Sequence, residues 1–248
     1  MTWLRVVRSE VRKLSTTKMP LGFLLALLAL SATTATAVLI GTDADGSKGF
    51  ISTPADQRSL VAFAANAMMI AALFGAIAVA REYGHGTVVP TYLASPRRHR
   101  AVFAQLAAAF LAGALLGLVG NALTIGAVAL VLPFVEYGFM LSAGAVLQLL
   151  VASAFAGAVG AVLGAGVGSV VRNVGGSVTA TVFLLFILPP LIVQMASGAI
   201  SWVPNALALV VSRVTDDPAL PSAVAVLAAY GLIPALVGAI AVHRRDVV

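Results

Sequence analysis

Residues 143–168 read AGAVLQLLVASAFAGAVGAVLGAGVG and contain no charged side chain. A helix needs about 20 apolar residues to cross a hydrocarbon core of ~30 Å, so this stretch is long enough to span a membrane. Gly160, Gly164 and Gly168 recur every four residues and share one helical face. Small residues at this spacing allow close helix packing, although membrane helices are also rich in glycine in general. The stretch predicts a buried membrane helix, with a specific packing seam and general glycine enrichment both left open.

Other apolar stretches of similar length lie near 20–40, 59–80, 101–132, 177–197 and 222–242. The run at 101–132 is too short for two crossings and is expected to form one long helix. Of the 248 residues, 60% are hydrophobic and only 10% are charged, whereas soluble domains carry about 25% charged residues. We therefore predict an all-α, polytopic membrane protein with six transmembrane helices, in which Pro189-Pro190 break or kink the fifth span.

The basic residues predict the orientation of the chain. With the N-terminus inside, the outer loops hold only Lys48, Arg58 and Arg213, and every other Lys and Arg lies on the inner side. Most acidic residues fall outside. Such a bias follows the positive-inside rule, so both termini are expected in the cytoplasm and the chain in the cell (inner, cytoplasmic) membrane as a multi-pass protein.

Residues 1–19 are expected to form a cytoplasmic amphipathic helix at the membrane surface. Apolar residues occupy one side of the helical wheel and arginines lie on its flank, where they can meet anionic headgroups. The alternative is a signal peptide cleaved after Ala35-Thr36-Ala37, but the long patterned segment before the apolar run favours retention. The residues assigned to the surface helix are Trp3, Arg5, Arg8, Glu10, Arg12 and Leu14.

The interiors of the six spans contain no Asp, Glu, Lys, Arg or His. Carriers usually keep such a residue there for an ion or proton, so a secondary carrier is disfavoured. No metal-ligand spacing and no Ser-His-acid set appears, and the run GTDADGSK at 41–48 lacks the residue order of a phosphate-binding loop. We expect no catalysis, metal or cofactor on this chain. Polar residues that could line a substrate path, or only bond neighbouring helices, are Asn66, Asn121, Gln148 and Gln194.

Residues 81–100 read REYGHGTVVPTYLASPRRHR and separate the second and third spans. The segment is longer than a turn between two helices needs. Residues 88–95 are expected to form a short helix that projects into the cytoplasm, with Thr87 as a candidate N-cap. The alternative is a basic loop that only fixes topology. On the other side of the membrane, residues 198–221 form a long outer loop in which Trp202 favours a short interfacial helix over an irregular loop.

Two short motifs resemble the ABC-2 type permease family. Glu82-x-x-x-Gly86-Thr87 followed by Tyr92-Leu93-Ala94-Ser95-Pro96-Arg97 is similar to the family's E-x-x-x-G-T … L-x-x-x-P-x-R signature. The Ser9-Glu10-x-x-Lys13-Leu14 run resembles the start common in that family. The resemblance extends over the whole chain in length, number of spans and N-terminal helix. Pro90 departs from it and is expected to shorten the short helix.

The resemblance implies the membrane subunit of an ATP-driven exporter. Two permease protomers, identical or related, would pair, and each would dock on a separate cytoplasmic ABC ATPase that binds ATP and Mg²⁺. A charge-free interior suggests a hydrophobic or amphipathic cargo such as a drug, lipid or peptide, and no nucleic acid is expected as a partner. The alternatives are a membrane scaffold that does not transport, and a secondary carrier. The residues implied in ATPase coupling are Glu82, Gly86, Thr87, Tyr92, Leu93, Pro96, Arg97 and Arg172.

Overall fold

The computed structural model describes residues 3–44, 46–64, 67–84 and 98–244. Within these ranges the chain is helical and contains no strand. Six helical segments are long and apolar enough to cross a membrane. This confirms the prediction of an all-α protein with six candidate spans, which are Met19–Ile40, Pro54–Gly84, Ala101–Val135, Ala143–Val171, Val174–Met195 and Leu220–Val242.

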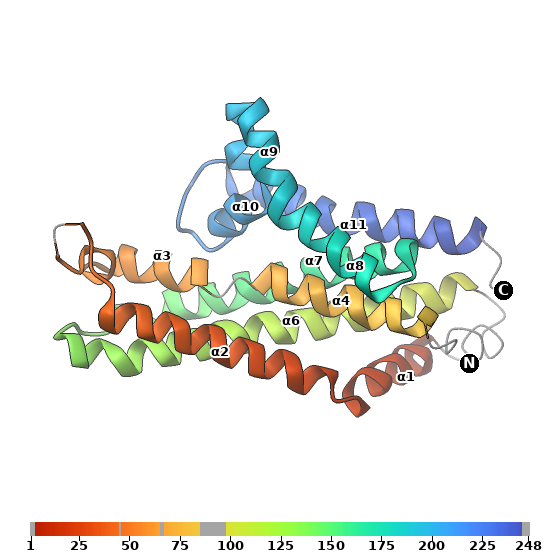
Figure 1. The fold of residues 1–248 in the computed structure, drawn as a ribbon, viewed down its shortest axis with the longest axis horizontal. Helices are drawn as coiled ribbons and strands as arrows, with labels where there is room; N and C mark the ends of the chain where they lie inside the picture. The colour runs from red at the N-terminus through yellow and green to blue at the C-terminus, as the bar shows by residue number, and fades with distance from the viewer. Residues whose placement is uncertain (1–2, 45, 65–66, 85–97, 245–248) are drawn as a thin grey trace.

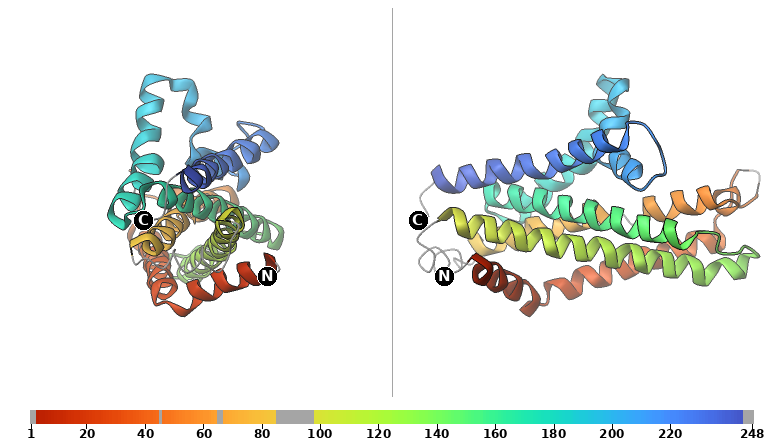
Figure 2. Two further views of the ribbon diagram at one scale, coloured as in Figure 1. Left: turned by 90° about the vertical axis from the view of Figure 1, so that its right-hand side faces the viewer. Right: turned by 180° about the vertical axis from the view of Figure 1, so that it is seen from behind.

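Helices α4, α7 and α11 run parallel to one another, and α2 and α6 run in the opposite direction (Figure 1). The start of α1, the ends of α4, α7 and α11 and the start of α6 lie at one end, which we call the termini end (Figures 1 and 2). The α-helices are α1 Trp3–Thr16, α2 Met19–Ile40, α3 Pro54–Ala64, α4 Ala67–Gly84, α6 Arg98–Val131, α7 Ala143–Val171, α8 Val174–Val182, α9 Leu188–Met195, α10 Pro204–Val211 and α11 Leu220–Arg244.

Helix α7 is the centre of the bundle, and every residue from 156 to 169 is buried. Gly160, Gly164 and Gly168 all face the backbone of α4. A Cβ atom at Gly164 would overlap the carbonyl oxygen of Ala72, and one at Gly168 would lie 2.8 Å from the carbonyl oxygen of Ala76. The two backbones therefore touch along this face, as small residues at this spacing allow.

On two further sides of α7, glycine also allows direct backbone contact with a neighbouring helix. A Cβ at Gly117 of α6 would overlap the carbonyl oxygen of Ser153, and one at Gly166 of α7 would meet the backbone of Pro234 in α11. Glycine thus brings three different helices against α7 at backbone distance. Because side chains are absent from these contacts, the relative positions of α4, α6, α7 and α11 are set by their backbones.

Two prolines alter the fifth candidate span. Pro189 and Pro190 lack an amide hydrogen and cannot complete the α-helical pattern of the preceding turn. A π-helical turn at Phe183–Ile187 lies directly before them, as is common where a helix is interrupted. Beyond this turn α9 extends away from the bundle (Figures 1 and 2), and none of its residues is buried.

The loop between the fifth and sixth spans is largely helical. It contains a 3₁₀ turn at Ser197–Trp202 and helix α10, so the short helix expected there is present. Helix α10 packs its buried residues Leu207 and Val210 into a cluster with α7 and α11. A location of this helix at a membrane surface stays a prediction.

Gln57 joins the loops at the end opposite the termini. Its side chain is 0% exposed. The Nε2 group donates to the carbonyl oxygens of Ile51 at 3.2 Å and Gly138 at 2.9 Å, and Oε1 accepts from the amide of Met140 at 3.0 Å. One glutamine therefore ties the start of the second span to the loops that follow α2 and α6.

Candidate functional site at the end of α4

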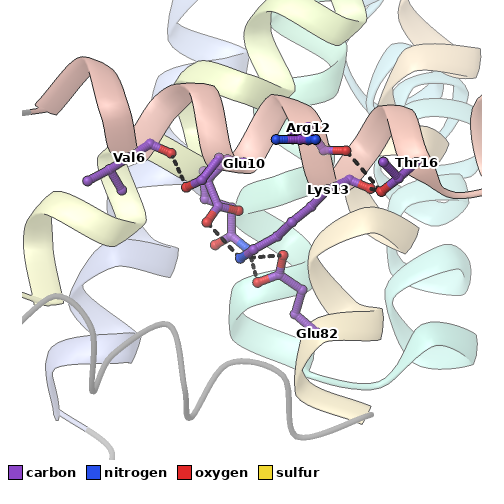
Figure 3. A network of polar contacts seen from close by, with 8 residues as sticks. Val6, Glu10, Arg12, Lys13, Thr16 and Glu82 are labelled. Atoms are coloured by element: carbon purple, nitrogen blue, oxygen red, sulfur yellow. Dashed lines mark hydrogen bonds and ion pairs between the residues drawn. The ribbon is translucent and has the colours of Figure 1, made fainter.

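The last turn of α4 carries Glu82, whose carboxylate lies between α1 and α6. Lys13 Nζ of α1 is 3.7 Å from Glu82 Oε1 and 2.7 Å from Glu10 Oε1. Gln105 Nε2 of α6 donates to Glu82 Oε2 at 2.9 Å. Figure 3 shows the ammonium of Lys13 lying between the two carboxylates. This polar group joins three helices that are distant in the sequence.

The cluster is shielded from solvent on its acidic side. Glu10 is 4% exposed, and the side chains of Glu82 and Lys13 are 17% and 42% exposed. Charges in such an environment interact more strongly than they would in water. Removal of one partner would leave a buried charge without compensation. The position of α1 therefore depends on the position of the end of α4.

The neighbouring residue, Tyr83, contacts the end of α7. Arg172 is the C-cap of α7 and adopts a left-handed conformation with φ 59°. Its Cζ atom lies 5.0 Å from the centroid of the Tyr83 ring, within range of a cation–π interaction. Arg172 Nε also donates to the carbonyl oxygen of Ser169 at 3.4 Å. The turn that follows α7 is thus held against the end of α4.

Helices α1, α6 and α7 consequently all meet the last turn of α4, on which Glu82 and Tyr83 are adjacent. The chain continues from this turn into residues 85–97. Apart from Glu82 and Arg172, the residues implied in ATPase coupling lie in that segment. These residues, like Asn66, lie outside the described part of the chain, and they are Gly86, Thr87, Tyr92, Leu93, Pro96 and Arg97.

The structure shows α1 as a helix with an asymmetric exposure. Arg5, Arg8 and Arg12 are exposed, whereas Glu10 is buried against the bundle and Leu14 is half-buried. The side chain of Trp3 lies outside the described residues. Glu10, assigned to the membrane surface from the sequence, therefore belongs to the internal cluster with Lys13 and Glu82.

Asn121 lies inside the bundle. It is 0% exposed, and its Nδ2 group donates to Ser153 Oγ at 2.6 Å. One turn away, the hydroxyls of Thr124 and Ser31 are 3.2 Å apart. Asn121 therefore joins α6 to α7 in this conformation. Its Oδ1 atom has no hydrogen-bond partner within the described residues.

The remaining two polar candidates lie elsewhere. Gln194 is exposed on α9, and Gln148 accepts a hydrogen bond from Arg58. An apolar pocket of about 190 Å³ is lined by the π-helical turn, α9, the 3₁₀ turn at Ser197–Trp202 and Tyr230 of α11, and Gln194 is not part of its wall. The Tyr230 hydroxyl on this wall donates to the carbonyl oxygen of Trp202 at 3.3 Å. The polar positions that the structure describes therefore do not converge on one path in this conformation.

The described ranges contain no group of three or more His, Cys, Asp or Glu residues that could hold a metal ion. Sequence reasoning missed the roles of Lys13, Tyr83 and Gln105. The i,i+3 spacing of Glu10 and Lys13 is a local signal for their ion pair, but no local signal places Lys13 beside Glu82. A comparison of the sequence with models of known protein families and with curated proteins gives no match.

Proposed function

We propose that this chain is the permease subunit of an ATP-driven exporter of the ABC-2 type. Two protomers form the substrate path, and a separate cytoplasmic ATPase, which binds ATP and Mg²⁺, drives it. The cargo is hydrophobic or amphipathic. Both termini are cytoplasmic, α1 lies along the inner surface of the cell membrane, and residues 85–97 dock on the ATPase.

One observation carries this proposal: three helices meet the last turn of α4, at the root of the proposed docking segment. Lys13 and Gln105 bind Glu82, and Arg172 lies against Tyr83. A displacement of the docking segment would act first on this turn and, through these contacts, on α1, α6 and α7. Chains of packed side chains and polar contacts are a common carrier of such coupling.

The glycine contacts between α4 and α7 support the same proposal. Because Gly160, Gly164 and Gly168 leave no side chains between the two backbones, α4 and α7 are expected to move as one body. A force applied at the end of α4 would then shift the central helix and change how the surrounding helices are arranged. Rigid-body shifts of packed helices are a common form of such transitions.

The features of α1 favour the proposed orientation. Arg5, Arg8 and Arg12 are exposed at the termini end, where they would face anionic lipid headgroups of the inner leaflet. The internal contact of Lys13 with Glu82 fixes this surface helix to the transmembrane bundle. Movement of the bundle and the position of α1 on the membrane would therefore be linked.

The first test is mild-detergent purification of the tagged chain from its native membranes, followed by mass spectrometry. We expect a stoichiometric ATPase with a phosphate-binding loop to co-purify. Leu93→Glu should abolish this association without lowering the amount of chain in the membrane, because a charge would replace an apolar contact. Thr42→Glu, an exposed substitution in the loop at the opposite end, is the control and should retain the ATPase. Retention by both variants would contradict the docking assignment.

A second measurement separates the exporter from its alternatives. Inverted membrane vesicles that contain the complex should accumulate an amphipathic dye when ATP is added, and a protonophore should leave the accumulation intact. Loss of accumulation with the protonophore would indicate a secondary carrier. An ATPase that co-purifies but whose ATP turnover does not respond to any dye or lipid would indicate a scaffold.

A further inference from the structure

Arg58 and Arg213 lie at the end of the bundle opposite the termini, and a hydrogen bond joins Arg58 to the residue directly before Arg213. Arg58 of α3 donates from Nε to the carbonyl oxygen of Ser212 at 2.9 Å and from Nη2 to Gln148 Oε1. Ser212 is followed directly by Arg213, whose positive charge acts on the guanidinium of Arg58. These hydrogen bonds hold Arg58 in place through Nε and Nη2, and neither of them uses Nη1.

Among the described residues, no carboxylate forms an ion pair with Arg58 or Arg213. Two acidic residues at this end bind hydroxyl groups instead: Asp56 accepts from Thr53 Oγ1 at 2.5 Å, and Asp217 accepts from Ser201 Oγ at 2.8 Å. Arg58, held by its two hydrogen bonds, and the exposed Arg213 therefore form a positively charged site at this end of the bundle.

A purely structural role accounts for only part of this arrangement. Ser212 is the C-cap of α10, and a cation near the C-terminus of a helix is stabilised by the helix dipole. This explains the bond from Arg58 Nε. It does not explain why a second cation, Arg213, follows Ser212 in the chain, because its positive charge acts unfavourably on Arg58 unless an anion lies nearby.

The position of Arg58 along the second candidate span indicates which kind of anion this site would bind. Arg58 lies one turn after the start of α3, and the apolar sequence of the second span begins directly after it at residue 60. If the hydrocarbon region begins with this apolar sequence, Arg58 is expected at the level of the lipid headgroups, where phosphates lie. Guanidinium groups match phosphate in geometry and can bind it through two parallel hydrogen bonds.

We propose that Arg58 and Arg213 bind the phosphate of a membrane phospholipid, in the outer leaflet in the proposed orientation. Gln148 and the Ser212 carbonyl orient Arg58, and exposed Arg213 closes over the phosphate from the loop after α10. The bound lipid strengthens the connection that the two hydrogen bonds of Arg58 make between α3, α7 and the α10–α11 loop. Such a lipid site requires neither transport nor an ATPase.

The test is native mass spectrometry of the purified chain, delipidated in detergent and titrated with phosphatidylglycerol. Diacylglycerol with the same acyl chains and inorganic phosphate serve as comparison ligands. We expect saturable binding of phosphatidylglycerol, with about tenfold weaker affinity after Arg213→Gln because a charge-assisted hydrogen bond is lost. Arg213→Lys should lose less. Glu136→Gln, which changes an exposed charge at the same end, should not weaken binding.

Two outcomes would overturn the proposal. Equal binding of phosphatidylglycerol and diacylglycerol would show that the phosphate is not recognised. Full competition by millimolar inorganic phosphate, without any requirement for acyl chains, would identify a site for a soluble anion instead of a lipid. Arg213 is exposed, so its substitution should leave the fold intact; an unchanged affinity in Arg213→Gln would also contradict the assignment.

Discussion

The guanidinium carbon of Arg172 lies 5.0 Å from the centre of the Tyr83 ring. Arg172 ends α7, and Tyr83 belongs to the last turn of α4, from which the segment at 85–97 departs. The segment proposed to dock on the ATPase and the turn that carries Arg172 are therefore linked through the protein itself. A partner that moves one of them would act on the other without touching it.

This contact predicts an energetic coupling between the two residues. In a double-mutant cycle with Tyr83→Leu and Arg172→Met, we expect an interaction free energy of about 0.5–2 kcal/mol, as for other partly buried cation–π pairs. The measurement is thermal unfolding of the four proteins in one detergent. The distant pair Tyr83→Leu and Arg58→Met is the control and should be additive. Additivity in both cycles would mean that Arg172 and Tyr83 are neighbours without mutual stabilisation.

Lys13 is expected to stabilise the bundle because it separates two carboxylates. Lys13→Gln should lower the free energy of unfolding by about 1–3 kcal/mol, since Glu10 and Glu82 would lose the ammonium group that lies between them. Adding Glu10→Gln to this variant should restore part of the loss, because one uncompensated charge is removed. The exposed Lys18→Gln is the control. A double variant that is less stable than Lys13→Gln alone would disprove the shared ion pair.

Gly164 is expected to tolerate no side chain. A Cβ there would overlap the carbonyl oxygen of Ala72, so Gly164→Ala must push α4 away from α7 and should destabilise the bundle by about 3 kcal/mol. Gly126→Ala is the matched control, because Gly126 is also helical but a Cβ added there would meet no atom within 4 Å. Monodisperse elution and melting temperature in detergent would be compared. Similar behaviour of both variants would refute the close α4–α7 contact.

The predicted effect at Gln57 concerns the opposite end. Gln57→Leu would leave two carbonyl groups and one amide in a buried position without their partner, which should destabilise the protein by about 2 kcal/mol or more. Gln194→Leu, on the exposed surface of α9, should change the melting temperature little. Increased proteolysis of the loop at 132–142 in Gln57→Leu would show that the loop has lost its attachment. Equal protection in both variants would contradict this role.

The sequence predicts the membrane helices well because they depend on a local property. Long apolar stretches free of charge identify spans whatever their neighbours are, and all six candidates are visible in this way. The face of α7 that carries Gly160, Gly164 and Gly168 is also visible as a spacing. Which helix lies against that face is not visible, since the complementary α4 residues are mainly ordinary alanines, with Met68.

The candidate site is less predictable for the same reason. Glu82 stands out by its place in a motif, and Arg172 by its place in a short connection, but neither position indicates Lys13 or Tyr83 as a partner. For Asn121 the sequence leaves two roles open, a place on a substrate path or a bond to a neighbouring helix. The structure shows a hydrogen bond to Ser153 of α7, which the sequence does not identify as the partner. Long-range pairs depend on the packing of the whole bundle, which a single sequence does not display.

The central position of α7 has a consequence for how the protein is made. Synthesis places α2, α4 and α6 in the membrane before α7 emerges from the ribosome, so the small-residue faces of α4 and α6 are formed before their partner exists. Until then, these faces must be covered by lipid or by the insertion machinery. Insertion of the fourth span is therefore expected to convert loosely associated helices into a packed bundle. A chain truncated before α7 should be degraded, because its small-residue faces have no partner.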